Sequence, residues 1–450
     1  MKIAIPQFVN NIIDELERAG YETYTVGGCV RDALENTEPH DWDVCTAALP
    51  EEIKDVLGGI VNIIPTGIAH GTVTVKGDAP DEILELTTFR TDGDYSDGRH
   101  PDRVDFVRSI KEDLSRRDFT VNAIAYSPER GVVDPFHGTD DLKAKLLRCV
   151  GDPVKRFSED GLRILRCLRL SAVKGFTVER KTAEAAIECR NMLSSVSWER
   201  IDEELLKLLG SPRPGELMDE YRDVFITLIP ELKDEVGYDQ HSMYHNRDVW
   251  HHSLAALDDI PPDMPHLRLV MLLHDIAKPT VGIIDDKGIG RFKKHPQVGA
   301  EMAEAILKRM KFPSKFVQRA KTLVLYHDVR VPAERVEVRK FLSSVGEDAF
   351  RQILIIQHAD GAGKYTKFMK ETEERLGKVE ELLNSIITDG DCTSLSRLAV
   401  SGHDLINAGI PEGKGLRNIL NRLLELVMED KVANNREELL KSVVSVNREK

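Results

Sequence analysis

Two aspartates, Asp41 and Asp43, flank Trp42 in a short segment with the composition of a β-strand. Alternate residues of a strand point to the same face, so the two carboxylates would lie side by side while Trp42 packs on the other face. Neighbouring carboxylates repel each other unless a cation lies between them, and Mg²⁺ accepts such ligands while leaving positions for substrate phosphates. The spacing therefore indicates a magnesium site for phosphate chemistry. A solvated acidic turn is the alternative for this pattern taken alone.

A pair of glycines precedes these aspartates. Gly27 and Gly28 stand where a predicted strand gives way to a predicted helix that carries Arg31. Glycines at such a junction let backbone N–H groups approach a polyphosphate, and a helix N-terminus favours an anion. We expect Gly28 and Arg31 to contact phosphates, although a tight structural turn would need the same glycines.

Four charged residues, Asp160, Arg163, Arg166 and Arg169, follow at steps of three within a predicted helix over 157–172. Asp160 and Arg163 would be neighbours on one helical face. Since a carboxylate only accepts and a guanidinium only donates, together they can match the base edge of cytosine or adenine. Arg166 and Arg169 would extend a basic stripe for phosphates. An ordinary ion pair on a solvated basic face is the alternative.

Five ordered blocks within residues 22–210 resemble the class II tRNA nucleotidyltransferases and bacterial poly(A) polymerases of the DNA polymerase β superfamily. The blocks are residues 27–32 with 41–43, 65–72, 88–101, 116–123 and 159–163. The resemblance implies transfer of a nucleotide from CTP or ATP to an RNA 3′ hydroxyl, with Mg²⁺ held by Asp41 and Asp43. It also implies that Arg117 and Asp118 face the ribose and phosphates of the nucleotide.

The same resemblance favours CCA addition to tRNA without a nucleic-acid template. The block 65–72 resembles the CCA-adding branch, and the basic segment of the poly(A) branch is missing there. Segment 94–101, with Arg99 and His100, corresponds to the loop that the family uses to switch from C to A addition. The alternatives are a poly(A) polymerase, a phosphohydrolase with a relic head, and a non-catalytic RNA-binding protein.

A histidine-rich block resembles the HD phosphohydrolase superfamily over about residues 245–365. A His–Asp pair supplies one nitrogen and one oxygen ligand to a divalent metal, and other helices complete the set. By this pattern the inner ligands are His252, His274, Asp275 and Asp360, and a second ion would be held by His295 and His327. His252 is preferred over His251. Such a centre would permit hydrolysis of phosphate esters, for example 2′,3′-cyclic phosphates or 2′-phosphates; structural or exposed histidines are the alternative.

The elements that must position these residues predict an α+β chain. Strands near 24–26, 42–44, 71–75 and 104–107, with helices over 10–19 and 50–57, indicate a small head over 1–150 of the polymerase-β type that the resemblance implies. The rest is predicted to be helical: a neck (151–235) with helices over 180–193 and 198–209, an HD domain (236–365) and an RNA-binding tail (366–450). The tail would end in an apolar helix over 416–428, and residues 414–422 are candidates for tRNA contact.

Composition limits the class of protein. With 450 residues, 41% of them hydrophobic, the chain can bury several cores, and its net charge of −14 argues against non-specific coating of nucleic acid. No apolar run approaches the ~20 residues of a membrane span, and the first residues do not resemble a signal peptide. The six cysteines form no CxxC pair. We expect a reduced, cytoplasmic protein that does not bind membranes; the oligomeric state stays open.

Overall fold

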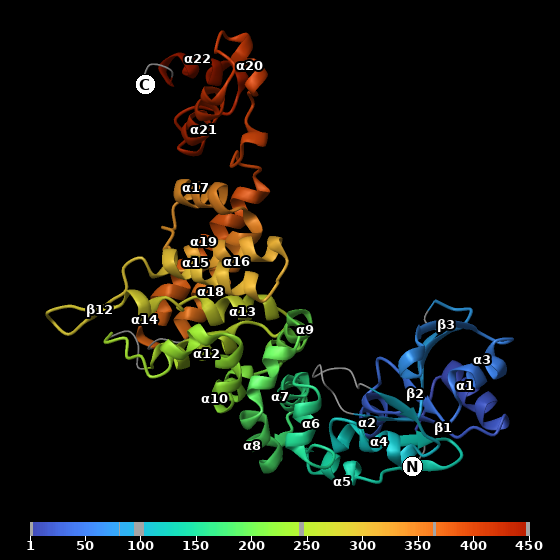
Figure 1. Cartoon of the computed structure of the whole chain (residues 1–450). Helices are drawn as coiled ribbons and strands as arrows, with labels where there is room; N and C mark the ends of the chain where they lie inside the picture. Colours follow the sequence, from blue (N-terminus) through green and yellow to red (C-terminus); the bar gives the residue numbers. More distant parts are fainter. Residues whose placement is uncertain (1–2, 81, 94–102, 243–246, 363–365, 447–450) are drawn as a thin grey trace. The chain divides into compact units, whose positions relative to one another are not determined.

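A computed structural model describes residues 3–80, 82–93, 103–242, 247–362 and 366–446 (Figure 1). It divides the chain into two compact units, Met1–Pro230 and Glu231–Lys450. We call these unit 1 and unit 2. The division falls five residues before the boundary that we predict between the neck and the HD domain.

The head in unit 1 is built on a mixed sheet. Seven strands of its described part follow the order β3-β4-β5-β2-β1-β8-β9. Strand β2 pairs with β1 in antiparallel and with β5 in parallel orientation, so the strand that begins at Asp43 is central. The strands are β1 Thr23–Val26, β2 Asp43–Thr46, β3 Asn62–Gly67, β4 Thr72–Lys76, β5 Ile83–Thr88, β8 Ala125–Ser127 and β9 Gly131–Val133, beside two-stranded pairs of β6 Arg90–Asp92 with β7 Val104–Phe106 and of β10 Leu146–Leu147 with β11 Thr177–Val178.

Helices cover this sheet through regularly spaced apolar residues. Helix α1 (Gln7–Arg18) buries Val9, Ile12, Ile13 and Leu16, which is the spacing of one helical face. These side chains share a core cluster with residues of β2, β4 and β5 and of α3 (Pro50–Leu57). The other helices of the head are α2 Gly28–Leu34, α4 Ile110–Ser115 and α5 Gly138–Lys143.

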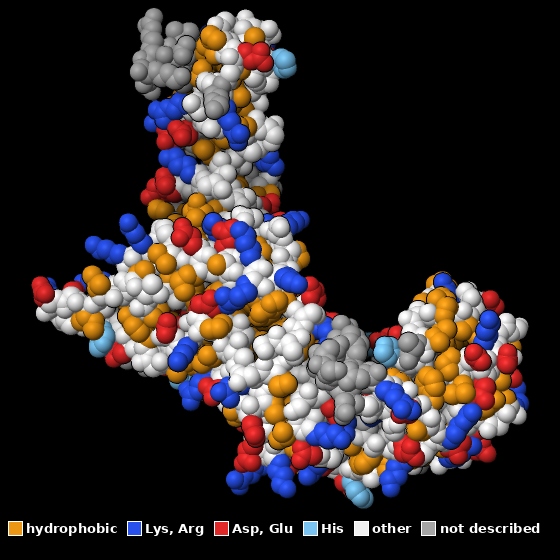
Figure 2. All heavy atoms as spheres, viewed as in Figure 1, with side chains coloured by type: hydrophobic (Ala, Val, Ile, Leu, Met, Phe, Trp, Pro, Cys, Tyr) orange, Lys and Arg blue, Asp and Glu red, His pale blue; other side chains and the backbone are white. Residues whose placement is uncertain are grey.

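The edge strand β3 lies away from this central position. Figure 2 shows hydrophobic side chains on the surface over it, and Ile64 on this strand is exposed. Asp43, in contrast, lies on β2 in the middle of the sheet, where a strand pairs with β2 on each side.

Helices follow the head, as predicted. In unit 1 they are α6 Pro153–Glu159, α7 Leu162–Lys174, α8 Arg180–Glu188, α9 Trp198–Leu209, α10 Pro214–Glu220 and α11 Arg222–Leu228. The α+β class with a helical remainder is thus confirmed.

The predicted continuous helix over 157–172 is wrong. Asp160 has an extended backbone (φ −145°, ψ 107°), and the chain forms two helices, α6 and α7. The break has a local cause, because the Asp160 carboxylate accepts a hydrogen bond from the N–H of Leu162 at 3.0 Å and so caps the second helix. Asp160 and Arg163 therefore do not share the face of one helix.

Glycine is required next to this break. A Cβ atom at Gly161 would lie 2.6 Å from the carbonyl oxygen of Met192. We expect Gly161→Ala to destabilise unit 1 by about 1–3 kcal/mol, because the backbone of the 190–195 segment must shift. Chemical denaturation of the full chain measures the effect. Gly151→Ala is a poor control because its φ is positive, whereas Gly59→Ala, where a Cβ meets nothing within 4 Å, should change stability little.

Unit 2 is helical apart from one hairpin of β12 (Ile283–Ile284) and β13 (Gly290–Arg291) in its described part. Its helices are α12 Val249–Asp259, α13 Pro265–Leu273, α14 Lys278–Val281, α15 His295–Arg309, α16 Ser314–Tyr326, α17 Arg335–Val345, α18 Glu347–Ala362, α19 Thr366–Thr388, α20 Gly402–Asn407, α21 Lys414–Met428 and α22 Arg436–Val446.

Two features refine the predicted tail. Helix α19 packs against α17 and α18, whereas a separate hydrophobic cluster runs from Cys392 to Val443. The apolar helix predicted over 416–428 is present as α21, but α22 follows it, so it is not the last helix. Within the described residues, no helix has the length and apolar character needed to cross a membrane.

Candidate active sites

The first candidate site lies where β2 begins. Asp43 is the first residue of this strand and Asp41 lies just before it; both are exposed, while Trp42 packs into two core clusters. The parallel pairing of β2 with β5 puts Glu85 opposite Asp43 in register, and Glu85 is exposed as well. Three carboxylates therefore face solvent together, which is a donor set that suits Mg²⁺.

Electrostatics at these carboxylates favour a bound cation. Desolvation by the surrounding protein raises the pKa of Asp43 although the residue keeps contact with solvent. Arg117 lowers this pKa, whereas Glu85 and Asp41 raise it further. Carboxylates that oppose one another's ionisation in this way are relieved by a divalent ion between them.

The glycine turn lies against the same carboxylate. Gly27 has a φ of +83°, which favours glycine, and a Cβ there would lie 3.2 Å from the guanidinium of Arg117 and 3.8 Å from the carboxylate of Asp43. Arg117 is held by an ion pair of 3.2 Å with the buried Asp113. The turn, the arginine and the aspartate thus converge on one place, while Gly28 begins α2.

Arg31 lies beside this turn but is bound to other residues. Its guanidinium is buried and donates to Asn122 at 2.6 Å and to Asp32. Asn122 in turn donates to Asp118 at 3.0 Å, and Asp118 accepts from Arg166 of α7 at 2.7 Å. A polar chain therefore connects the α2 turn to the first neck helices.

The charge of Asp118 is stabilised within this chain. Burial would raise the pKa of Asp118, but Arg166, the Asn122 amide and Arg163 lower it to about 2. Because this value is below the ~3.9 of an unfolded Asp, the group contributes stability that is present above about pH 4 and is lost as the pH falls toward 2.

We therefore expect Arg166→Met to destabilise the protein by about 1–2 kcal/mol at pH 7, a figure reduced for the partial exposure of Arg166. The difference from the wild type should shrink as the pH falls to 3, because Asp118 of the unfolded chain, with a pKa of about 3.9, takes up a proton in this range. Urea unfolding at both pH values measures this. Arg180→Met, which removes an exposed arginine paired with Glu184, is the matched control.

The remaining neck residues also have partners. Asp160 binds Arg200 of α9 at 2.7 Å, Arg163 binds Glu159 at 2.6 Å, and Arg169 pairs with Glu204. With Arg166 bound to Asp118, each arginine of the predicted basic stripe has a carboxylate beside it. In the structure these arginines form ion pairs that hold α7, and Arg200 is a further partner that no local sequence signal indicates. Arg99 and His100 lie outside the described residues.

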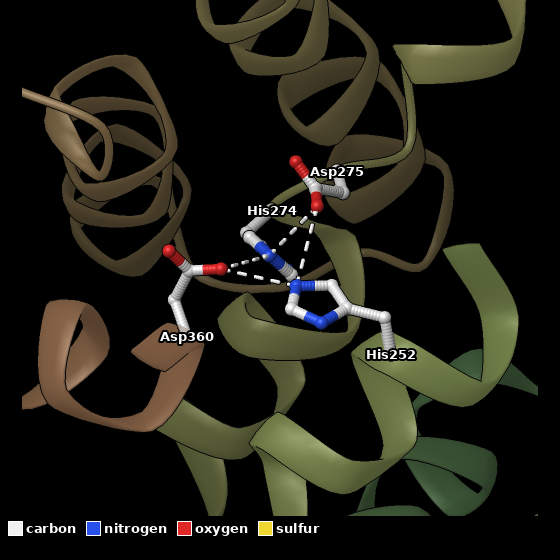
Figure 3. A group of neighbouring side chains, drawn as sticks. All are labelled: His252, His274, Asp275 and Asp360. Carbon is white, nitrogen blue, oxygen red and sulfur yellow. Dashed lines mark hydrogen bonds and ion pairs between the residues drawn. The ribbon is translucent and has the colours of Figure 1, made fainter. Parts of the chain in front are cut away.

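The second candidate site is a metal centre in unit 2. Figure 3 shows His252, His274, Asp275 and Asp360 pointing toward one another from α12, the end of α13 and α18. The Nε2 atom of His252 lies 3.0 Å from Asp360 and 3.6 Å from Asp275, and Nε2 of His274 lies 3.1 Å from Asp275. All four ligand atoms lie within 4.8 Å of one another.

A second group shares Asp275 with the first. His295 and His327 present Nε2 atoms 3.4 and 3.7 Å from Oδ1 of Asp275, whereas the first group uses its Oδ2. The structure therefore places all six predicted ligands in two adjacent clusters. His251 is exposed and bonds to Asp248, which agrees with the choice of His252.

Backbone carbonyls orient three of the histidines. Nδ1 of His274 lies 2.7 Å from the carbonyl of Met271, that of His295 2.8 Å from Phe292, and that of His327 2.7 Å from Val324. Donation by Nδ1 leaves the lone pair on Nε2, which is the tautomer that binds a metal.

Buried atoms without hydrogen bonds also fit a metal. Nε2 of His274 and both carboxylate oxygens of Asp275 are buried and make no hydrogen bond within the described residues, although the Lys278 ammonium lies 2.6 Å from Asp275. Burial lowers the pKa of His274, yet Asp275 and Asp360 raise it to about 10. The cluster of His252, His274, Asp275 and Asp360 thus strongly favours a positive charge.

Comparison with known proteins decides the family. A protein named CCA-adding enzyme from Leuconostoc mesenteroides is 32% identical over 96% of this chain and 94% of its own length. A protein of the same name from Limosilactobacillus reuteri is 31% identical over 97% and 96%. The chain belongs to the CCA-adding enzymes. This membership agrees with the class II resemblance read from the sequence.

Models of three protein domain families match separate parts of the chain. The "Poly A polymerase head domain" matches residues 23–148, the "Probable RNA and SrmB- binding site of polymerase A" 175–235, and "tRNA nucleotidyltransferase domain 2 putative" 295–443. The CCA-adding enzyme of Bacillus stearothermophilus, solved in complex with CTP, aligns with a TM-score of 0.67 and 26% identity over 99% of both chains. The Thermotoga maritima CCA-adding enzyme, solved with tRNA, shares the fold at 19% identity, with a TM-score of 0.62 over 99% of this chain and 100% of that one.

Proposed function

We propose that this chain adds C, C and A to the 3′ end of tRNA from CTP and ATP without a nucleic-acid template. The observation that carries the proposal is the full-length likeness to CCA-adding enzymes, joined to the exposed carboxylates at the start of β2. The poly(A) polymerase alternative receives less support, because these full-length relatives carry the CCA-adding name.

In this proposal the residues of the head have distinct tasks. Asp41 and Asp43, with Glu85 beside them, would hold Mg²⁺, which lowers the pKa of the attacking hydroxyl and stabilises the leaving pyrophosphate when it is bound. Gly27 and Gly28 let the backbone approach the triphosphate, and Arg117 supplies a cation directly beside Asp43.

The polar chain behind this site would position the nucleotide. Arg31, Asn122, Asp118 and Arg166 fix the α2 turn relative to α7, so the phosphate and base subsites keep a defined spacing. Asp160 and Arg163 remain the proposed readers of the base edge. Asp160 follows α6 and Arg163 lies in the first turn of α7, so a base would meet a turn rather than the face of one helix.

A tRNA that lacks its terminal CCA tests this function directly. Incubated with the four labelled NTPs and Mg²⁺, the protein should yield a tRNA extended by CCA and nothing longer. A long A tail would instead support the poly(A) alternative. Binding of tRNA without release of pyrophosphate would support the non-catalytic alternative, and either result would contradict the proposal.

A second function, metal-dependent hydrolysis of phosphate esters, is proposed for unit 2 as an HD domain. The two histidine–aspartate clusters support it, because paired metal sites of this kind activate water for attack on phosphorus. Manganese, nickel, cobalt and magnesium tested in turn on a 2′,3′-cyclic nucleotide and a 2′-nucleotide would identify the ion.

The helices after residue 366, including α21, are proposed to contact the backbone of tRNA and to recognise its shape. The cytoplasm is the proposed compartment.

A further inference from the structure

The metal residues of unit 2 open into a cavity of about 680 Å³. Asp275, His295, His327 and Asp360 form part of its wall. The same wall also carries the cationic side chains of Lys278, Arg291, Lys293, Lys294, Arg330 and Arg375. Besides Asp275 and Asp360, its carboxylates are those of Asp328 and Glu371. A cavity with this surplus of positive side chains beside a metal centre suits an anion.

One of these cations is oriented by the helix that holds a metal ligand. Arg375 of α19 donates to the side-chain oxygen of Gln357 at 3.0 Å. Gln357 is buried on α18, where it donates to the carbonyl of Val329 at 2.8 Å, and it precedes Asp360 by one turn. The amide is therefore fixed at both ends, and it holds the guanidinium on the cavity wall near the metal ligand.

This guanidinium has no carboxylate partner within 4 Å among the residues that the structure describes. Arg330, another cation, lines the same cavity, and its charge acts on Arg375. Burial, and then Arg330, lower the pKa of Arg375. Two guanidiniums that repel each other in a partly buried wall are stabilised by an anion that lies against both. Elsewhere in unit 2, Arg335 and Arg339 show the usual alternative. They share Asp391, and each also pairs with a second aspartate, Asp389 and Asp430 respectively.

We propose that Arg375, oriented by Gln357 and assisted by Arg330, binds the phosphate group of the substrate of unit 2. The inference rests on the proposed phosphohydrolase function and names the residues that would recognise its substrate. A planar guanidinium can donate two parallel hydrogen bonds to phosphate oxygens, which a metal ion alone does not provide. The group recognised is a terminal phosphate, whether it belongs to a mononucleotide or to the end of an RNA.

Binding of inorganic phosphate tests the proposal without turnover. The full-length protein is saturated with Mn²⁺, its metal content is measured, and phosphate affinity is determined by calorimetry. Arg375→Met should weaken phosphate binding about 10- to 100-fold, because a charge-assisted hydrogen-bond pair is lost, while metal content stays unchanged. Arg351→Met is the matched control, since Arg351 lies on α18 but pairs with Glu347 and does not line the cavity.

Gln357→Glu provides a second variant that keeps the shape of the side chain. A carboxylate at this position would pair with Arg375 and compete with phosphate, so affinity should fall as in Arg375→Met. This variant decides the matter if Arg375→Met does not fold. Unchanged phosphate affinity in the folded variants, or an equal loss in Arg351→Met, would overturn the proposal.

The same variants separate this inference from the proposed hydrolysis. If the wild type binds phosphate through Arg375 but hydrolyses no ester, the hydrolysis is wrong and the binding role stands. If it hydrolyses p-nitrophenyl phosphate with a KM that Arg375→Met does not raise, the binding role is wrong and hydrolysis stands. Competition by a 3′-mononucleotide and by a short RNA with a 3′-phosphate then distinguishes the two sources of the group.

Discussion

Replacement of Asp43 by asparagine is expected to reduce nucleotide incorporation into tRNA by about a thousandfold or more. The change keeps the shape of the side chain but removes one of the charges that would hold Mg²⁺ at the start of β2. Arg117 would then face a neutral amide, and the ion would lose one of its charged ligands. The initial rate of labelled CTP incorporation into tRNA lacking CCA measures the effect.

Two controls make this result specific. Asp55→Asn changes an exposed aspartate on α3 and should leave the rate unchanged. Hydrolysis by unit 2 should persist in Asp43→Asn. Incorporation at a normal rate by Asp43→Asn would show that the reacting phosphates lie elsewhere.

Replacement of Asp275 by asparagine is expected to remove metal from unit 2 and to abolish hydrolysis of phosphate esters, with a loss of at least about a hundredfold. Asp275 contributes one oxygen to each of the two clusters, and it is the residue that the two clusters share, so its replacement affects both metal sites. Metal content after dialysis, determined by mass spectrometry, is the primary measurement.

Incorporation of CTP and ATP should survive this change, because the nucleotidyl transfer is assigned to residues of unit 1. Asp286→Asn, an exposed aspartate of the β12–β13 hairpin, is the matched control for a lost carboxylate in unit 2. Retention of the metal by Asp275→Asn would contradict the ligand assignment, and simultaneous loss of CCA addition would contradict the separation of the two activities.

Patterns within short segments predicted much of this architecture. The aspartates of β2 and the histidines of unit 2 have residue types and spacing that carry their own chemical meaning, and the structure brings both sets together. The helices of the neck were harder to predict, because the apolar spacing of residues 157–172 continues across Asp160. Only the side-chain cap on Leu162 and the approach of Met192 to Gly161 interrupt the helix, and neither is visible in apolar periodicity.

Residues that depend on tertiary pairing escaped prediction altogether. Glu85 reaches Asp43 through the parallel register of β5 and β2, which are separated by the β3–β4 hairpin. Arg200 reaches Asp160 from a different helix, and Gln357 and Arg375 meet only because α18 and α19 pack together. Such pairs have no fixed spacing along the chain, so they require the folded structure.

The carboxylate shared by the two histidine clusters has a consequence for metal uptake. The first dication to arrive neutralises Asp275 and turns a centre that attracts cations into one that resists the next. Loading should thus proceed in two steps of unequal affinity, with a tight ion followed by a weaker, exchangeable one. Mild chelation would then yield a half-loaded protein, and the concentration of free metal in the cell would decide how much of the chain carries the complete pair.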